Sequence, residues 1–333
     1  MVVVMSTEEG PSWLIWMITA SCNLNCPYCY STHYLKERPL GREEVMRLLR
    51  EAASSGIKHI DYTGGEPLTR RDISDILEET ADLGIGASIF TNLTLLSQDI
   101  ASKISRLDIE VATSLDGPRE IYERVKGQGT WEKFSRGIDE LKRRNIPFHV
   151  NITVSTMNYD RVGDAIILAN DLGADSISII PSMAFGRALE TKSFIGREEF
   201  LKSVIQADRV AEEIGIRVSV WCSPFLGVLG LRNIYYSDCR EFRELDVSPG
   251  GKVLICDVMG VEVADLMKDG IKGAWRKLNE NEIYLKAKEL PLECLDCGAC
   301  RGGCYARAFN HWGRLPSIDP LCPRTFIKLP PRT

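Results

Sequence analysis

Short runs of apolar and β-branched residues alternate with longer amphipathic stretches through the first two thirds of the chain. The apolar runs predict strands at residues 14–19, 59–63, 87–91, 109–114, 148–154, 176–180 and 217–221. The stretches with helical spacing predict helices at residues 42–53, 70–83, 130–144, 160–172 and 197–214. This alternation, with strands that are apolar on both faces, is typical of a parallel sheet flanked by helices.

The repeated strand–helix units favour a barrel or partial barrel over a doubly wound sheet, because no dinucleotide-binding fingerprint accompanies them. In a barrel the loops that follow the strands gather at one end, and chemistry takes place there. We therefore predict an α/β fold with a barrel or partial barrel at residues 13–221, preceded by an N-terminal segment at residues 1–12.

The sequence pattern changes after Trp221. Gly, Pro and Cys clusters replace the alternation, and most of the 11 cysteines lie between Cys222 and Cys322. In a reducing compartment such cysteines indicate metal binding rather than disulfides. We predict a second, small, cysteine-rich domain at residues 222–328, followed by a tail at residues 329–333.

Composition and charge exclude several classes of partner. The chain has 333 residues and a net charge of −5, which is unfavourable for binding nucleic acid by counterion release. Its longest apolar runs, such as residues 13–19, are far shorter than the roughly 20 residues of a membrane span. Residues 1–10 lack the basic region and cleavage site of a signal peptide. These features predict a cytoplasmic protein without nucleic-acid or membrane partners.

Three cysteines directly follow the first predicted strand: Cys22, Cys26 and Cys29. Three thiolates in one loop can hold three corners of a cubane iron–sulfur cluster, which leaves the fourth iron open for another ligand. Four thiolates would close a structural site, so an open position favours catalysis. A zinc site with His33 or another residue as fourth ligand is the alternative that the spacing leaves open.

This loop resembles the CxxxCxΦC signature of radical S-adenosylmethionine (SAM) enzymes, with Tyr28 as the aromatic residue before the third cysteine. Two later segments at predicted strand ends are similar to the GGEP and SxDG motifs of that family. The resemblance implies the fold of the family, a partial (β/α)6 TIM-like barrel at residues 13–221. The resemblance implies that SAM binds the open iron of a [4Fe–4S] cluster and is cleaved to a 5′-deoxyadenosyl radical, which abstracts a substrate hydrogen. It implies cofactor contacts at Tyr28, Gly64, Gly65, Glu66, Pro67, Ser114 and Asp116.

Two further features concern the same site. Thr91 and Asn92, at the end of the third predicted strand, are a weaker match to a family segment. Where relatives often carry an arginine soon after SxDG, this chain has Arg124 and Lys126. By resemblance, either residue could meet the SAM carboxylate as a point charge, without a bidentate contact.

The remaining eight cysteines fit two closed sets of four. The densest run has the spacing of bacterial ferredoxins, in which the fourth cysteine serves the other cluster and a remote Cys-Pro completes the first. We assign one set to Cys294, Cys297, Cys300 and Cys322. We assign the other set to Cys239, Cys256, Cys304 and, as a fourth ligand or else a buried structural thiol, Cys222. A pair of zinc ribbons is the alternative, although the paired knuckles of a ribbon are missing.

This part of the chain resembles the SPASM extension of radical SAM enzymes, which carries two auxiliary iron–sulfur clusters. The match begins with Cys239 and with Gly251 five residues before Cys256, but the gap between Cys297 and Cys300 is two residues instead of five. The resemblance implies two auxiliary clusters of the [4Fe–4S] type. Asp257 matches an acid that sulfatase-maturase-like relatives place near the substrate as a general base; a solvated loop aspartate is the alternative.

The resemblance implies a maturase that oxidises or cross-links an amino-acid residue of a peptide or protein. A small-molecule substrate, such as a tetrapyrrole or metal-cofactor precursor, is the second interpretation, and a non-enzymatic electron-transfer or zinc-binding protein is a remote third. A reducing partner such as ferredoxin or flavodoxin is expected. Because about a dozen residues precede the first strand, too few for a leader-peptide-binding domain, a separate peptide-recognition protein is a further candidate partner.

Overall fold

The computed structural model describes residues 10–241 and 243–325. Its strands form a sheet in the order β11-β10-β9-β1-β2-β3-β4-β5-β6-β7-β8. Strands β1 to β8 are parallel, β9 pairs with β1 in parallel orientation, and β10 and β11 are antiparallel. The strands are β1 (Trp13–Thr19), β2 (His59–Gly64), β3 (Gly86–Phe90), β4 (Glu110–Ser114), β5 (Phe148–Val154), β6 (Ser176–Pro181), β7 (Val218–Val220), β8 (Ile234–Tyr236), β9 (Glu244–Val247), β10 (Lys252–Leu254) and β11 (Glu262–Asp265).

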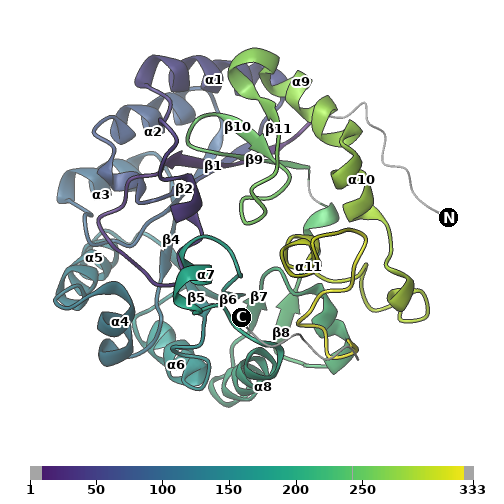
Figure 1. The fold of residues 1–333 in the computed structure, drawn as a ribbon. Helices are drawn as coiled ribbons and strands as arrows, with labels where there is room; N and C mark the ends of the chain where they lie inside the picture. The colour runs from purple at the N-terminus through teal and green to yellow at the C-terminus, as the bar shows by residue number, and fades with distance from the viewer. Residues whose placement is uncertain (1–9, 242, 326–333) are drawn as a thin grey trace.

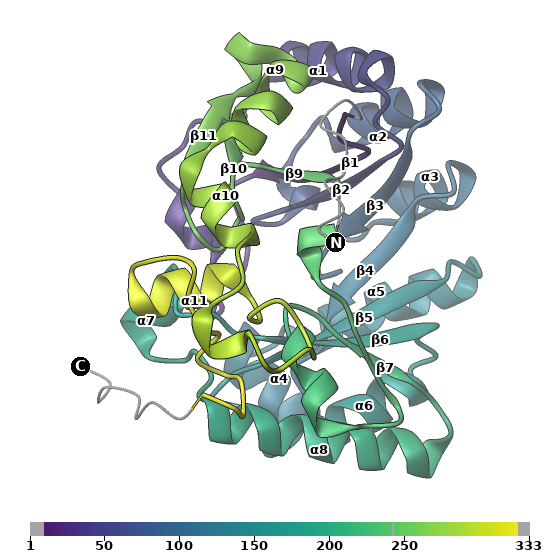
Figure 2. The same ribbon diagram turned by 90° about the vertical axis from the view of Figure 1, so that its right-hand side faces the viewer.

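Helices form an outer layer around the curved sheet (Figure 1). Those between the parallel strands are α1 (Arg42–Ser55), α2 (Ile73–Asp82), α3 (Gln98–Arg106), α4 (Arg119–Lys126), α5 (Trp131–Arg143), α6 (Val162–Asp171), α7 (Arg187–Thr191) and α8 (Arg197–Ile214). The later ones are α9 (Leu266–Glu280), α10 (Glu282–Lys288) and α11 (Tyr305–Trp312). Figure 2 shows α7 and α11 at the same end of the sheet.

The two faces of the sheet differ in chemistry. Ile60 and Tyr62 of β2 are fully buried, and the Tyr62 hydroxyl lies 2.6 Å from the Thr80 hydroxyl of α2, so this face packs on the helices. Asp61 therefore points to the opposite, inner face of the sheet, since side chains alternate along a strand. Burial of the apolar outer face stabilises the barrel and leaves the inner face free for polar side chains.

The fold predicted from the sequence is confirmed: an α/β partial barrel with a cysteine-rich C-terminal region. The strand predicted at residues 148–154 matches β5, and the helix predicted at residues 197–214 matches α8. The region after Trp221, where no strand was predicted, adds β8 at one edge of the sheet and β9, β10 and β11 at the other. The domain boundary at residues 221 and 222 stays a prediction.

None of the helices between residues 10 and 325 is long and apolar enough to cross a membrane.

Candidate active site

The loop after β1 holds the three cysteines of the first cluster. Cys22 is exposed, whereas Cys26 and Cys29 are half-buried, and the Cys29 amide donates to the Cys26 carbonyl at 3.2 Å. Partial loss of solvent around the thiol, with smaller contributions from the charges of Glu66, Cys26 and Cys29, raises the pKa of Cys22 to about 11. Thiolates that repel one another need a cation to remain ionised together, so this donor set fits a soft metal or a cluster.

Helix α7, which follows β6 much later in the chain, holds this loop in place by hydrogen bonds. The Arg187 amide donates to the Cys29 carbonyl at 3.0 Å, and its guanidinium donates to the Cys26 carbonyl at 3.1 Å. A Cβ at Gly186 would lie 2.5 Å from the Tyr30 carbonyl oxygen, so this position requires glycine. No local motif predicts a contact between Arg187 and the cysteine loop, and only the folded chain brings the two together.

The two glycines of the GGEP segment allow strand β2 to approach the segment that leads into Cys22. A Cβ on Gly64 would lie 2.2 Å from the Thr19 carbonyl oxygen, and one on Gly65 would lie 2.1 Å from that of Ser21. The observed close approach is thus between two backbone segments. Substitution of either glycine would displace the start of the cysteine loop.

Glu66 connects the ends of β2 and β3. It is 1% exposed, and its carboxylate accepts from the Asn92 amide at 2.7 Å, the Thr91 hydroxyl at 2.8 Å and the Leu68 amide at 3.0 Å. Burial raises the pKa of Glu66, while these hydrogen bonds lower it. Pro67 begins the short 3-10 turn that presents the Leu68 amide. These bonds explain Thr91 and Asn92 structurally, and the predicted contact between Glu66 and SAM stays a prediction.

A buried polar network joins the cysteine loop to the end of β4. The Tyr28 hydroxyl donates to the Asp116 carboxylate, and Lys126 donates to the Tyr28 hydroxyl at 3.0 Å and to the Ser114 hydroxyl at 2.9 Å. The Lys126 ammonium lies 3.4 Å from an Asp116 oxygen, and Asn158 donates to the Asp116 carbonyl at 2.9 Å. The structure therefore brings together three of the predicted cofactor residues.

Lys126 is the cation of this network, and Arg124 is not. The Lys126 side chain is 4% exposed, whereas Arg124 points outward and donates to the Met157 carbonyl at 2.6 Å. Burial alone would lower the pKa of Lys126, but the charges of Asp116 and Cys26 outweigh it and raise the pKa. Burial raises the pKa of Cys26, and the charge of Lys126 partly offsets that rise, so Lys126 favours the thiolate form of that ligand candidate. The spacing of the two basic residues alone could not distinguish them.

Four cysteines from distant segments meet beside α11. Cys222 and Cys304 share a hydrogen bond that lowers the pKa of Cys304 and raises that of Cys222. Burial raises the pKa of both Cys239 and Cys256, and the charge of Cys304 adds to both. This convergence supports Cys222 as the fourth member of the set, an assignment that stays a prediction.

The second set also converges. Burial raises the pKa of Cys294 to about 12, with further contributions from the charges of Cys300, Cys322 and Cys297. The Cys297 amide donates to the Cys294 carbonyl at 3.1 Å, as expected for a CxxC turn. In each set the four thiols therefore act on one another electrostatically, and thiolates are the ligands of iron–sulfur clusters and of structural zinc.

A buried ion pair connects the two sets. Arg307 donates to Asp319 at 2.6 Å and to the Cys222 carbonyl at 2.7 Å, and Asp319 accepts from the Cys304 amide at 2.8 Å. The Cys322 amide donates to the Asp319 carbonyl at 3.0 Å. Asp319 is fully buried, so this pair holds both cysteine sets in one rigid unit. Neither residue gave a sequence signal beyond being charged.

Asp257 lies between the first cysteine loop and the four-cysteine set that contains Cys256. One of its carboxylate oxygens is 3.7 Å from the Cys256 sulfur, and its carbonyl accepts from the Tyr34 hydroxyl at 2.6 Å. Burial raises the pKa of Asp257, and a hydrogen bond from Tyr30 lowers it. Tyr30 directly follows Cys29, so the carboxylate is coupled to the loop of the first cluster.

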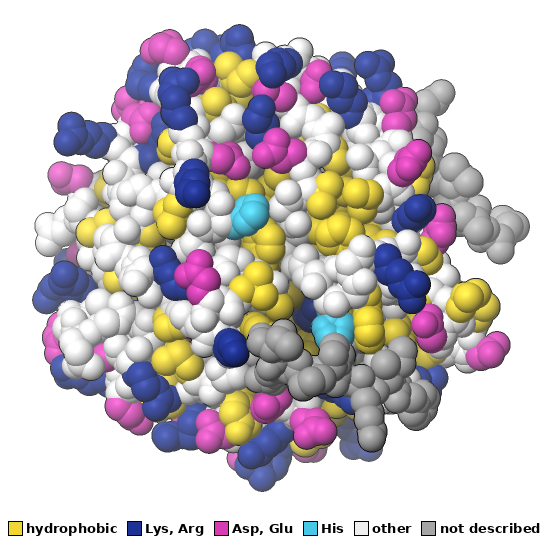
Figure 3. All heavy atoms as spheres, in the orientation of Figure 1, with side chains coloured by type: hydrophobic (Ala, Val, Ile, Leu, Met, Phe, Trp, Pro, Cys, Tyr) yellow, Lys and Arg dark blue, Asp and Glu magenta, His cyan; other side chains and the backbone are white. Residues whose placement is uncertain are grey.

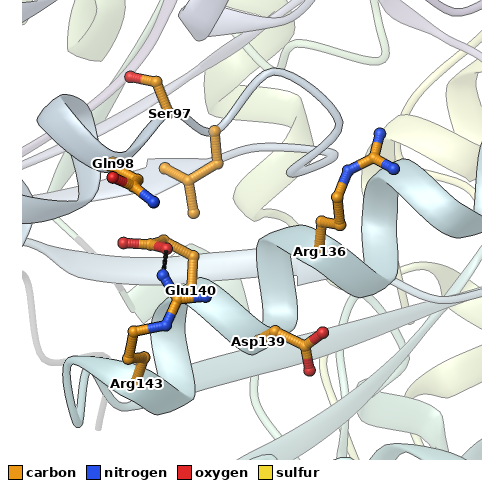
Figure 4. Close-up of a pocket in the computed structure, with 7 residues that line it drawn as sticks. Ser97, Gln98, Arg136, Asp139, Glu140 and Arg143 are labelled. Carbon is orange, nitrogen blue, oxygen red and sulfur yellow. Dashed lines mark hydrogen bonds and ion pairs between the residues drawn. The ribbon is translucent and has the colours of Figure 1, made fainter.

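The end of the barrel that carries these groups has a largely apolar centre and a charged rim (Figure 3). A separate pocket of about 300 Å³ lies on the outer surface, between the start of α3 and α5 (Figure 4). Its polar lining includes Ser97, Arg136, Asp139 and an ion pair between Arg143 and Glu140. None of the predicted site residues lines that pocket.

Comparisons with known proteins agree with this geometry. Residues 16–169 match the Radical SAM superfamily. The chain is 25% identical to an AdoMet-dependent heme synthase of Methanosarcina barkeri, over 96% of this chain and 98% of that protein. It is 24% identical to a PqqA peptide cyclase of Granulibacter bethesdensis, over 96% and 88% of the two chains.

Solved structures share the fold. The structure of native anSMEcpe with bound AdoMet superposes with a TM-score of 0.74 at 19% identity and covers 94% of both chains. That of Streptococcus suis SuiB bound to the precursor peptide SuiA gives 0.70 at 15% identity, over 95% of this chain and 76% of SuiB. Residues 16–169 are therefore a radical SAM domain, in a chain with the fold of anSMEcpe and SuiB, and its cofactors, by family, are SAM and iron–sulfur clusters.

Proposed function

We propose that this enzyme oxidises or cross-links an amino-acid residue in a peptide or protein. When bound, SAM and the clusters supply a hydrogen-abstracting radical and acceptors for an electron. The protein must then remove a proton from the substrate, and Asp257 is the group placed to accept it. The observation that carries the proposal is this carboxylate, 3.7 Å from the Cys256 sulfur and hydrogen-bonded to the tyrosine that follows Cys29.

The remaining assignments of the site follow from the same arrangement. Cys22, Cys26 and Cys29 would hold the SAM-binding cluster, with Tyr28, Ser114, Asp116 and Lys126 as a preorganised polar support. The two four-cysteine sets would hold auxiliary clusters. With Cys222 as a fourth ligand, the set beside α11 has no open position, which favours electron transfer over substrate binding at that cluster.

A tetrapyrrole or similar cofactor precursor is the second candidate, because relatives include an AdoMet-dependent heme synthase. The inner face of the barrel argues against it. There burial, followed by the charges of Asp257 and Asp61, raises the pKa of Glu244 to about 7, and burial followed by the charges of Asp257 and Glu244 raises the pKa of Asp246. A substrate that carries several carboxylates would be repelled by this surface.

The peptide proposal extends to partners. A peptide ligand for this chain is suggested by two similar proteins that act on or bind peptides by name, the PqqA peptide cyclase and SuiB bound to its precursor peptide SuiA. A reducing partner such as ferredoxin or flavodoxin would supply the electron for SAM cleavage, and a separate recognition protein could present the peptide.

The test uses the reconstituted enzyme under anaerobic conditions with SAM, a reductant and peptides encoded beside the gene. We expect 5′-deoxyadenosine together with a peptide that has lost two hydrogen atoms, measured by mass spectrometry. Asp257→Asn should reduce peptide oxidation by roughly 10²–10⁴-fold. The iron content, and the SAM cleavage measured in the absence of peptide, should not change. Asp139→Asn, an exposed carboxylate on α5, is the matched control.

Two results would count against the proposal. Modification of a cofactor precursor in place of any peptide would favour the second candidate. Equal peptide oxidation by Asp257→Asn and Asp139→Asn would remove Asp257 from the chemistry.

A further inference from the structure

The inner face of the barrel carries three carboxylates on strands that flank β1, which we call the acidic wall: Asp61, Glu244 and Asp246. Asp61 and Asp246 are both in register with Ile15 of β1, and Glu244 is in register with Trp13. Since Asp61 faces the inside of the barrel, residues in the same row face inside as well. Leu245 and Val247, between and after the β9 acids, are fully buried on the other face.

The carboxylates of the acidic wall are incompletely neutralised. Asp61 accepts from the Trp13 indole at 2.9 Å and lies 3.4 Å from His59. Asp246 is 8% exposed; one of its oxygens accepts from the Asp257 amide at 2.8 Å, and the other has no hydrogen-bond partner among the described residues. The half-buried Glu244 side chain forms no hydrogen bond or ion pair with another residue of the described chain. The unpartnered, buried Asp246 oxygen is costly unless a ligand pairs with it.

On the opposite side of the barrel interior, the inward-facing residues of β5 are uncharged. There His149 contacts the Ser178 hydroxyl at 2.8 Å and stacks on Trp221 at 5.5 Å. Burial lowers the pKa of His149, so its ring is neutral at pH 7. Asn151, which follows on the same strand, is also neutral. The charges that act on Glu244 are those of Asp257 and Asp61, and both are negative.

The spacing of the wall suits an organic cation better than a metal ion. Neighbouring strands are about 4.8 Å apart, so the backbones of β2 and β9, which are separated by β1, are roughly 10 Å apart. Oxygen ligands must approach Ca²⁺ or Mg²⁺ within about 2.0–2.6 Å. In the described chain the one close group of metal-ligand type combines Asp246 and Asp257 with Cys256, which is already assigned to a cluster. An ammonium or guanidinium group on a flexible side chain can reach acids that are this far apart.

We propose that the acidic wall binds the cationic side chain of a lysine or arginine in the peptide substrate. This inference rests on the proposed function and specifies its substrate class. Asp257 lies directly above the wall, because its amide bonds to Asp246 and its carboxylate bonds to Tyr30 beside the cysteine loop. A peptide held by its cation at Glu244 and Asp246 would thus pass the general-base candidate.

Binding tests this proposal without requiring turnover. The reconstituted enzyme with SAM is titrated into dye-labelled Gly-Gly-Lys-Gly-Gly, its arginine counterpart and its norleucine counterpart, and fluorescence anisotropy is recorded. Norleucine keeps the apolar stem and lacks the charge. We expect the lysine or arginine peptide to bind about tenfold more tightly than the norleucine peptide. Glu244→Gln and Asp246→Asn together should remove that difference, whereas Asp139→Asn should retain it.

Equal binding of the charged and norleucine peptides, or binding of none of them, would overturn the proposal. So would displacement of the charged peptides by Mn²⁺ at stoichiometric concentration, which would make the wall a metal site. Iron content and the circular dichroism spectrum show whether the double variant is folded. If it is not, Glu244→Gln alone should reduce the preference. Charged peptides that bind but are never modified would instead refute the proposed function and leave the wall intact.

Discussion

Two buried polar regions of this enzyme are built in opposite ways. At the end of β4, Asp116 is paired with Lys126 and Tyr28, so its charge is neutralised from within the chain. On β9, Glu244 and Asp246 have no cation among the described residues. A neutralised network is rigid before any ligand arrives, whereas an unpaired one gains most when a ligand completes it. The first suits an invariant cofactor, and the second suits a substrate.

The largest effect is expected from the cysteines of the cofactor region. The triple substitution Cys22/Cys26/Cys29→Ala should abolish SAM cleavage and lower the iron content from about 12 to about 8 per chain, since each cubane holds about four irons. Iron and acid-labile sulfide after anaerobic reconstitution give the measurement. About 4 irons in the wild type, with zinc in the remaining sites, would refute the auxiliary clusters.

The neutralised network can be broken at its cation. Lys126→Met keeps the apolar stem but leaves Asp116 buried and unpaired, which should lower the free energy of unfolding by about 3–5 kcal/mol and weaken SAM binding. Arg124→Met, at the exposed basic residue two positions earlier, should change stability by about 0.5 kcal/mol or less. Thermal unfolding and SAM titration measure both effects. Equal losses in the two variants would show that Lys126 has no special role.

The acidic wall should respond to pH in the opposite sense from an ordinary ion pair. The pKa of Glu244 is raised from 4.5 to about 7 by burial and by the charges of Asp257 and Asp61, so the folded protein holds a proton that the unfolded chain releases. Stability should therefore fall as pH rises between about 4.5 and 7 and stay constant above that range. Glu244→Gln should remove this loss and be more stable than the wild type at pH 8, by about 1–3 kcal/mol.

Melting temperatures of the two proteins at pH 5 and pH 8 measure this difference. The gain should be small at pH 5 and largest at pH 8. A variant that is equally destabilised at both pH values would show that Glu244 is needed for packing.

The periodic spacing of apolar residues predicted most of the barrel, because it indicates which side of a helix or strand is buried. It missed β9 to β11, since a strand such as β9 (Glu244–Val247) carries two acids in four residues and reads as polar. That strand is stabilised by pairing with β1, more than two hundred residues earlier. Helix α4 was also missed because it is short and charged, although it delivers Lys126 to the site.

The residues of the candidate site also fall into two groups, those that a local motif predicts and those that it does not. The cysteine loop and the GGEP and SxDG segments indicated radical SAM chemistry in advance, because they resemble the motifs of that family. Arg187, Asn158, Arg307 and Asp319 could not be found in this way. Each supports the site by a hydrogen bond to a segment far along the chain.

By itself, the sequence determined the reaction class, because the cysteine loop and two further local motifs resemble those of one enzyme family. Only the tertiary structure decided which of two basic residues enters the cofactor network, that Cys222 meets Cys304, and that Asp61, Glu244 and Asp246 share one wall. These are contacts between segments distant in the chain. They depend on strand register and on which face each side chain occupies, and both are fixed only when the sheet has formed.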